Sequence, residues 1–336
     1  MLALLLLLLL PLQEPTPAYD PLAPQVEWAS DDLEVVDSER ERTIPVRIYL
    51  PEDEGPQPVI LFSHGLGGSR ESCGYLGDHW ASRGYVGVFV QHPGSDRDVW
   101  RGERLSDRRG ALLRAASPKN LILRVEDVSA VIDQLERWAS DEEHALHGRL
   151  DLDHIGMSGH SFGARTTQSL GGQSVALFDL SGRDDRIDAA LAMSPSRTPG
   201  IDMTAALSEV SIPWFLMTGT KDDSPIGDMP AASRLEVYAA LPVTVDRYQL
   251  VFDGGEHHAF GGVSNGTGRL MKRRDPDHHP AIQALSTAFF DTYLREDPAA
   301  REWLQGDGPR AMLDPLDAWD AEPSREAGDS SDSETP

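Results

Sequence analysis

A serine between two glycines, in the pentapeptide Gly159-His160-Ser161-Phe162-Gly163, is the side chain of this sequence best placed for covalent chemistry. An apolar run that ends in Ile155-Gly156-Met157 precedes it, and a helix-like stretch from Ala164 to Leu170 follows. A strand that turns sharply into a helix holds such a serine in a strained conformation, with its hydroxyl exposed above the sheet. The flanking glycines remove Cβ atoms that would clash at such a turn. The pattern predicts that Ser161 is a nucleophile; an ordinary turn is the alternative.

A serine hydroxyl is a weak nucleophile, and it needs a histidine base that is in turn oriented by a carboxylate. Where the serine comes first in the chain, the acid and then the histidine are expected after later strands. The candidates for the acid are Asp222 and Asp223, which come shortly after the apolar run from Trp214 to Gly219. The Gly-x-x-Asp spacing favours Asp222. A solvated turn with two surface carboxylates is the alternative.

The candidates for the base are His257 and His258, which follow the last strand-like run, Tyr248 to Phe252. Two glycines precede His257 at the spacing expected for a base that reaches back over the serine, and this favours His257. His160 lies inside the serine turn, and we expect its ring to point away from the position of a base.

Backbone amides must also stabilise the negative oxygen that forms when the serine attacks a carbonyl group. The amide that follows the nucleophile is that of Phe162. A second amide is expected from the loop Ser63–Gly68, which follows the strand-like run Pro58–Phe62 and whose glycines allow close approach of a ligand. Position in this loop favours Leu66.

The composition excludes several classes of protein. The 336 residues include 30 Lys and Arg against 55 Asp and Glu, which gives a net charge of −25. Clustered cations are needed to bind nucleic acids or anionic membrane surfaces, so neither partner is expected. A single cysteine, Cys73, permits neither an internal disulfide nor a site of several thiolates. We expect no metal and no cofactor.

Strand-like runs alternate with helical patterns between the chain ends, which predicts an α/β fold with a mainly parallel sheet covered on both faces. The segment from Asp96 to Asn120 interrupts this order, and we interpret it either as a flap over the ligand or as a surface loop. The expected strands are 33–37, 43–50, 58–62, 85–91, 153–159, 189–193, 214–219 and 248–252, the first two as an antiparallel pair, and the expected helices are 75–83, 125–138 and 281–294.

The two ends of the chain differ in composition from the rest. The apolar run Leu2–Leu10 is too short for a bilayer span of about 20 residues, but it has the length of a signal-peptide core. We therefore predict a signal peptide at 1–18, export, and no stable membrane insertion once the signal is removed. A proline-rich linker at 19–32, a catalytic domain at 33–305 and an acidic, disordered tail at 306–336 would follow.

Two motifs together resemble the α/β-hydrolase superfamily: Phe-Ser-His-Gly-Leu-Gly-Gly at 62–68 and Gly-His-Ser-Phe-Gly at 159–163. The resemblance is closest to the branch with platelet-activating-factor acetylhydrolases, cutinase-like polyester hydrolases and exported proteins similar to dienelactone hydrolases. It covers about 33–304, including 84–94 and 290–294. It implies an α/β-hydrolase fold with a doubly wound, mainly parallel sheet and helices on both faces.

The resemblance also implies roles for individual residues. Ser161 would be the nucleophile, Asp222 the acid and His257 the base, with Leu66 and Phe162 as amide donors. It implies a serine carboxylic-ester hydrolase that acts through an acyl-enzyme on a small or lipid-like ester, without a cofactor. A polyester hydrolase, a phospholipase of the acetylhydrolase type and an amidase are alternatives with the same machinery. A non-catalytic binding protein on the same fold is the alternative from another class.

Overall fold

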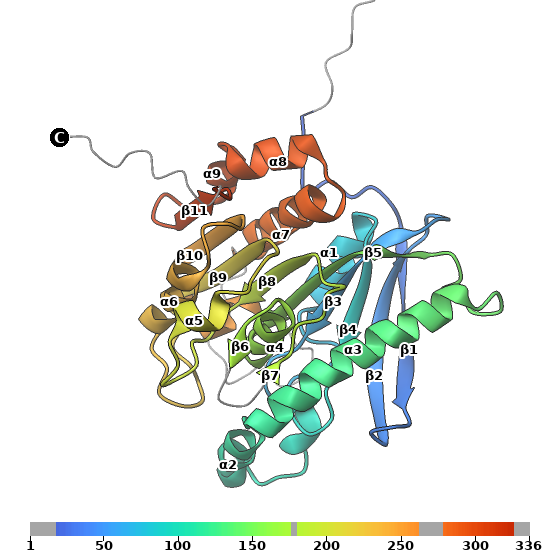
Figure 1. The fold of residues 1–336 in the computed structure, drawn as a ribbon, viewed down its shortest axis with the longest axis vertical. Coiled ribbons are helices and arrows are strands. Elements are labelled where there is room, and N and C mark those ends of the chain that lie inside the picture. Colours follow the sequence, from blue (N-terminus) through green and yellow to red (C-terminus); the bar gives the residue numbers. More distant parts are fainter. Residues whose placement is uncertain (1–17, 176–179, 262–277, 326–336) are drawn as a thin grey trace, which may run out of the picture.

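A nine-stranded mixed sheet forms the centre of the computed structural model, which describes residues 18–175, 180–261 and 278–325 (Figure 1). The strands lie in the order β1-β2-β4-β3-β5-β8-β9-β10-β11. Two further short strands, β6 (Ser174–Val175) and β7 (Leu180–Ser181), pair only with each other. In chain order the sheet contains β1 (Trp28–Asp37), β2 (Arg42–Pro51), β3 (Gln57–Ser63), β4 (Val86–Val90), β5 (Leu150–His160), β8 (Ala189–Met193), β9 (Trp214–Lys221), β10 (Arg247–Glu256) and β11 (Ala318–Glu322).

The six central strands, from β4 to β10, run parallel, and antiparallel pairs occur only at the two edges. All five residues of β4, Val-Gly-Val-Phe-Val, are buried, as expected for a parallel strand that is covered on both faces. The prediction of a mainly parallel, doubly wound sheet is therefore confirmed. The parallel arrangement brings the carboxyl ends of β3, β5, β9 and β10 to one edge, and this edge carries the site described below.

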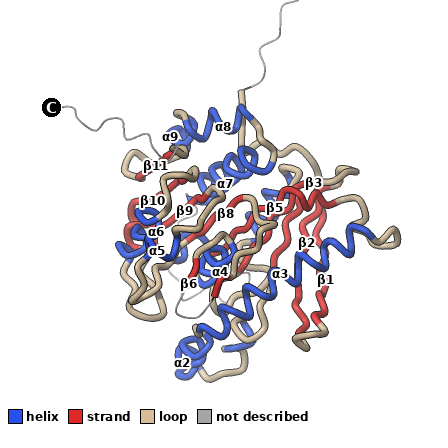
Figure 2. Tube along the Cα trace, viewed as in Figure 1, coloured by secondary structure: helices blue, strands red, loops and turns tan. Residues whose placement is uncertain are grey.

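Helices cover both faces of the sheet (Figure 2). One face packs against α1 and α7 around an aromatic cluster that includes Trp80, Phe89 and Phe290. The other face packs against α3, and against α4, α5 and α6 further along the sheet. The helices are α1 (Gly74–Ser82), α2 (Leu105–Ala115), α3 (Pro118–Ser140), α4 (Phe162–Leu170), α5 (Met203–Leu207), α6 (Leu235–Ala240), α7 (His278–Leu294), α8 (Pro298–Gln305) and α9 (Gly308–Met312), with 3₁₀ turns η1 (Arg97–Val99), η3 (Ala231–Arg234) and η4 (His257–Phe260).

Helix α3 begins seven residues before the predicted start at 125. The Ser117 side chain accepts a hydrogen bond from the amide of Asn120 at 3.2 Å, and Pro118 occupies the first helical position. Both are common signals for a helix start. The first turns carry few apolar residues, and the buried arginine at position 124 has no place in an apolar pattern. The apolar periodicity therefore predicted only the later part of the helix.

The chain ends contribute more to the sheet than predicted. Residues 28–32, placed in the linker by the prediction, belong to β1 and pair with β2. The prediction of a disordered tail is wrong for 306–322, which forms α9 and β11. Trp319 of β11 lies with its ring centroid 5.3 Å from that of Phe215 and 5.9 Å from that of Tyr248. One aromatic side chain thus stabilises a strand inside a segment whose average composition is polar and acidic.

The predicted signal peptide and the last part of the predicted tail, 1–17 and 326–336, lie outside the described residues. Within 18–175, 180–261 and 278–325, no helix is both long enough and apolar enough to cross a lipid bilayer.

Candidate active site

Ser161 lies in the turn between β5 and α4 with a positive φ of 58°. Its amide donates to the carbonyl oxygen of Met193 on the neighbouring strand at 2.9 Å, which holds the turn against the sheet. A Cβ atom at Gly163 would lie 1.8 Å from the carbonyl oxygen of Ser63, and one at Gly159 would lie 2.5 Å from the backbone of Gly163. The predicted strand, turn and helix are present, and the close approach of β3, β5 and α4 requires both glycines.

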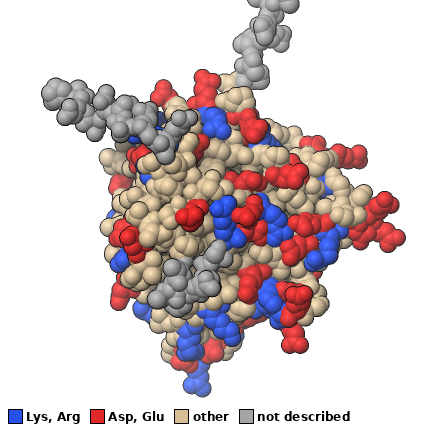
Figure 3. Space-filling view, in the orientation of Figure 1, with Lys and Arg blue, Asp and Glu red and all other residues tan. Residues whose placement is uncertain are grey.

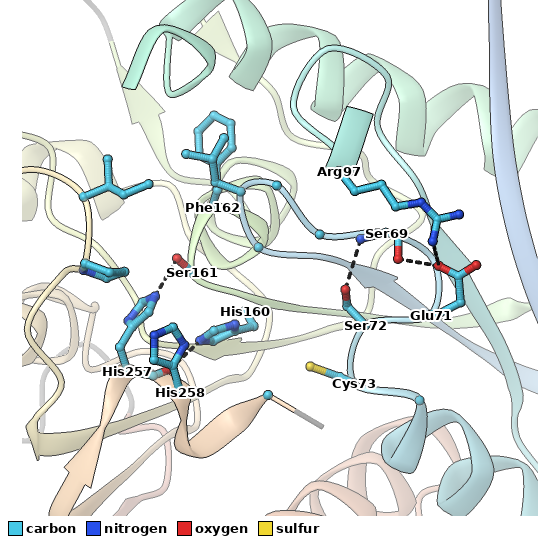
Figure 4. Close-up of a pocket in the computed structure, with 18 of the residues that line it drawn as sticks. Ser69, Glu71, Ser72, Cys73, Arg97, His160, Ser161, Phe162, His257 and His258 are labelled. Carbon is cyan, nitrogen blue, oxygen red and sulfur yellow. Dashed lines mark hydrogen bonds and ion pairs between the residues drawn. The ribbon is translucent and has the colours of Figure 1, made fainter. Parts of the chain in front are cut away.

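The side chains of Ser161, His257 and Asp222 form a hydrogen-bonded chain. Figure 4 shows the contact between Ser161 and His257. The Ser161 Oγ lies 2.9 Å from Nε2 of His257, and Nδ1 of His257 lies 2.7 Å from Oδ1 of Asp222. The three residues follow the carboxyl ends of β5, β10 and β9, so the parallel sheet brings them together although they are far apart in sequence. Asp222 is fully buried and His257 is 6% exposed, which limits the access of water to their hydrogen bond.

The neighbours of these residues, Asp223 and His258, lie elsewhere. Asp223 is exposed, and its carboxylate accepts a hydrogen bond from the amide of Ala231 at the start of η3. His258 is exposed on the groove side, with its ring centroid 5.7 Å from that of His257. The geometry brings the first member of each pair, and not the second, to Ser161.

A buried arginine, Arg234 of η3, holds Asp222 in place. Its Nε donates to the backbone oxygen of Asp222 at 2.7 Å and lies 3.1 Å from the carboxylate Oδ2. The same carboxylate oxygen accepts from the hydroxyl of Thr218 at 2.9 Å. One terminal nitrogen donates to the carbonyl oxygens of Ser194 and Pro195, each at 2.9 Å, and the other lies 3.1 Å from Nδ1 of His257. A buried carboxylate needs such partners, and these fix its orientation.

His160 supports the backbone of His257. Its Nε2 donates to the carbonyl oxygen of His257 at 3.0 Å, and burial holds the pKa of His160 well below its usual value, so the ring is neutral. The expectation that His160 points away from the base is wrong, because its ring stacks at a tilt beside that of His257, with centroids 4.8 Å apart. His160 is the last residue of β5, and its side chain lies toward His257.

The loop after β3 lies directly against Ser161. A Cβ atom at Gly65 would lie 3.5 Å from the Cβ of Ser161. The two amides that follow Leu66 in the loop donate to the carbonyl oxygens of Ser95 and Gly65, at 2.8 and 3.0 Å. The amide of Phe162 is the first of α4, and the first amides of a helix have no partner within it. Leu66 and Phe162 both line the groove around Ser161.

Arg124 of α3 lies fully buried beneath this loop. One terminal nitrogen donates to the carbonyl oxygen of His64 and to the hydroxyl of Ser63, the latter at 3.1 Å, and the other donates to the hydroxyl of Ser95 at 3.1 Å. The guanidinium also lies 4.7 Å from the centre of the Phe162 ring, in the geometry of a cation–π contact. Arg124 therefore contacts both the loop that contains Leu66 and the side chain of Phe162.

Asp127, one turn further along α3, is part of the same buried network. It forms an ion pair with Arg42 at 2.7 Å and accepts a hydrogen bond from Nδ1 of His92 at 3.2 Å. Burial alone would raise its pKa, but these hydrogen bonds lower the pKa of Asp127 to about 2. Burial lowers the pKa of His92 to about 4, so His92 is neutral at ordinary pH. Asp127 is thus a fixed negative charge in the region of Arg124.

A groove of about 1340 Å³ opens at Ser161. The segment 96–120, predicted as either a flap or a surface loop, forms part of its wall through η1 and the residues around it. Trp100 donates from its indole nitrogen to the carbonyl oxygen of Gly67 at 2.8 Å, and Arg97 donates from its amide to that of Gly68 at 2.7 Å. These bonds attach the segment to the same loop that carries Leu66.

No group of three or more His, Cys, Asp or Glu residues in the described part of the chain is arranged to hold a metal ion.

Comparison with known proteins identifies similarity to cutinases and to platelet-activating factor acetylhydrolases. Residues 43–99 match the family described as platelet-activating factor acetylhydrolase, isoform II. The chain is 24% identical over 266 residues to cutinase est2 of Thermobifida alba, a match that covers 79% of this chain and 69% of the relative. It is 24% identical over 212 residues to cutinase 2 of Thermobifida cellulosilytica, covering 63% of this chain and 64% of the relative.

The platelet-activating factor acetylhydrolase of Cavia porcellus is 23% identical over 300 residues, a match that covers 79% of this chain and 64% of the relative. The chain thus spans less than two thirds of the length of two of these three relatives.

Proposed function

The chain belongs to the α/β-hydrolase superfamily, in the branch that contains these cutinases and platelet-activating-factor acetylhydrolases, and on this premise we propose that it is a serine hydrolase of carboxylic esters. The observation that carries the proposal is the hydrogen-bonded chain from Ser161 through His257 to Asp222. The names of the relatives support an ester as the bond that is broken.

In the proposed reaction, Nε2 of His257 takes the proton from Ser161 as its Oγ attacks the ester carbonyl carbon. The same proton passes to the leaving alcohol, and an acyl-enzyme remains. Water then attacks the acyl carbonyl with the same histidine as base, which releases the acid and restores the serine. Asp222 keeps the proton on Nδ1 of His257 and stabilises the positive charge that His257 carries between these steps.

The amides of Leu66 and Phe162 are the proposed donors to the oxygen that becomes negative in both steps. Fixed backbone donors of this kind stabilise the transition state without having to reorient. The buried Arg124 supports both donors by holding the loop after β3 and the ring of Phe162.

Hydrolysis of a series of p-nitrophenyl esters with acyl chains of increasing length tests the proposal. We expect a burst of one p-nitrophenol per enzyme followed by turnover, and a fluorophosphonate probe should label Ser161, as located by peptide mass spectrometry. The profile over chain length measures the size of the acyl site. Failure of the folded protein to hydrolyse any ester and to react with the probe would instead support a non-catalytic binding protein.

Asp222→Asn should lower kcat by a factor of about 10⁴, because an amide no longer holds His257 in the required tautomer. Asp223→Asn is the matched control, since it makes the same change on the adjacent residue, and it should leave kcat close to that of the wild type. Steady-state kinetics on the best ester of the series decide between them. A larger loss of kcat in Asp223→Asn than in Asp222→Asn would show that Asp223, and not Asp222, is the acid.

The names of the relatives suggest two narrower substrate classes, polyesters and phospholipids of the platelet-activating-factor type. We also propose export, on the basis of the apolar run Leu2–Leu10. Mass measurement of protein recovered from the culture medium tests export, and recovery only from cells with Met1–Ala18 still attached would contradict it.

A further inference from the structure

Arg165 lies on α4 one turn after Ser161, and its amide donates to the carbonyl oxygen of Ser161 at 3.3 Å. Helical side chains lean toward the start of their helix, so a long side chain at this position covers the turn that carries the nucleophile. Arg165 is half-buried and lines the same groove as Ser161. One helical turn is about 5.4 Å along the axis, so the backbone of Arg165 lies about that far along the helix from Ser161.

The guanidinium of Arg165 has no hydrogen bond and no ion pair with any residue that the structure describes. Burial alone lowers the pKa of Arg165, with no carboxylate near enough to oppose it. Three other arginines that line the groove are paired: Arg47 with Asp32 at 2.8 Å, Arg97 with Glu71 at 3.2 Å, and Arg234 with Asp222 at 3.1 Å. A desolvated charge without a partner is unfavourable, and such a group gains most from an anion that binds beside it.

The segment 96–120, which forms part of the groove wall, is basic within an acidic protein. The segment 96–120 has seven Arg and Lys residues against four Asp and Glu, a local charge of +3 in a chain of −25. Arg101 lines the groove, is exposed and has no partner among the described side chains. Figure 3 shows acidic and basic side chains interspersed over this face, with a group of basic ones at the lower edge where α2 lies in Figure 1.

The acidic side chains of the groove lie on the side of α1. Glu71 is paired with Arg97, and burial raises the pKa of Asp78, an effect that the charge of Arg47 opposes. Neither forms an ion pair with Arg165. The guanidinium of Arg165 can therefore pair with an anionic group of a ligand.

We propose that the groove binds an ester that also carries an oxyanion, either a carboxylate or a phosphate-type group, and that Arg165 pairs with this group. The inference rests on the proposed function and adds a property of the substrate to it. A guanidinium offers two parallel N–H donors to a carboxylate or a phosphate, so it suits both groups. The exposed Arg101 and the basic segment 96–120 would attract the anion toward the groove.

Two p-nitrophenyl esters of equal chain length provide the first test: the hexanoate, which is neutral, and the mono-adipate, which ends in a carboxylate. A third, the 6-phosphonohexanoate, distinguishes a phosphate-type group from a carboxylate. Phenyl hexanoate and 4-carboxyphenyl hexanoate place the charge on the leaving group instead. The quantity measured is the ratio of kcat/KM for the anionic ester to that for its neutral counterpart.

Arg165→Gln should lower this ratio about tenfold to 100-fold for at least one of the anionic esters, as expected for the loss of a charge-assisted hydrogen bond. Arg165→Lys, which keeps the charge, should retain most of the ratio. Arg137→Gln is the matched control on the exposed side of α3, where the Arg137 side chain donates to Gln134, and it should leave the ratio unchanged. An unchanged ratio in Arg165→Gln for all three anionic esters would overturn the inference.

Calorimetry separates this inference from the proposed function. In a Ser161→Ala background, monomethyl adipate should bind more tightly than methyl hexanoate. Arg165→Gln should lower the ratio of the two affinities about tenfold or more. An equal affinity for both esters would overturn the anion site even if the enzyme is an esterase. If the affinity depends on the anion but the wild-type protein hydrolyses no ester, the anion site is supported and the proposed function is rejected.

Discussion

Ser161→Ala should lower kcat on the best p-nitrophenyl ester by a factor of about 10⁴ to 10⁶, because the remaining amide donors and binding contacts cannot replace a nucleophile. The variant should fold normally. The only side-chain hydrogen bond of Ser161 in the described residues is the one to His257 at 2.9 Å, and alanine fills the same space. Stopped-flow kinetics should show neither burst nor turnover, and the fluorophosphonate label should be absent. Retention of most activity would reject the mechanism.

Ser161→Gly separates catalysis from backbone strain. The positive φ of 58° at this position is costly for any residue with a Cβ atom, and glycine removes that cost. We therefore expect the glycine variant to be as inactive as the alanine variant but more stable than it, by about 1 kcal/mol in the free energy of unfolding. Denaturant unfolding of the two variants measures this difference. A glycine variant that is less stable than the alanine variant would show that the turn stores no strain.

His257→Gln should cost about as much in kcat as the loss of the serine, a factor of about 10⁴ to 10⁶, because the two residues act as one unit. His258→Gln is the matched control. Its ring lies on the groove side, with its centroid 5.7 Å from that of His257, and we expect at most a change in KM. The rate of labelling by the fluorophosphonate probe gives a second measure, since the probe also needs an activated serine.

The comparison of His257→Gln with His258→Gln distinguishes three outcomes. A large loss only in His257→Gln supports the proposed base, and equal losses would show that both histidines are needed. A loss confined to His258→Gln would mean that the hydrogen bond from His257 to Ser161 is not the productive one.

The centre of the fold was predictable because its signals are local. Each buried parallel strand is a short apolar run, and the predicted strand 189–193 has the bounds of β8. The strands at 58–62, 85–91 and 214–219 correspond to β3, β4 and β9 within two residues at each end. Runs of this kind are long enough to identify and are interrupted by glycines and charges at their ends.

The candidate site was predictable in part for the same reason. Ser161, Asp222 and His257 each follow a strand, and a parallel sheet brings such positions to one edge. The choice between Asp222 and Asp223 depends on which side chain points into the site. The backbone conformation of the irregular loop after β9 decides this direction, and the spacing of residues in the sequence does not determine it. The structure supplies the distances, and the kinetic experiments must supply the roles.

The supporting residues were not predictable from local patterns. Arg234 and Arg124 contact the site from η3 and α3, and their local sequences do not distinguish them from exposed arginines. Their burial depends on the packing of helices against the sheet. Arg165 differs from them, because its position four residues after Ser161 on a predicted helix already places it on the side of the nucleophile.

The strand β11 was missed because its interaction is with β10 and not with its neighbours in sequence. Five residues of modest hydrophobicity do not predict a strand alone, and the acidic residues that surround them suggested disorder. Pairing with β10 and the contacts of Trp319 provide the stabilisation that composition did not indicate.

The position of β11 has a consequence for how the protein is made. A nascent chain that has left the ribosome as far as η4 already contains Ser161, Asp222 and His257, but the edge of β10 still presents unpaired backbone groups. Such an edge is open to pairing with another chain until residues 318–322 emerge and cover it. Premature termination between α8 and β11 would therefore yield a polypeptide with all its proposed chemical groups and a strong tendency to aggregate.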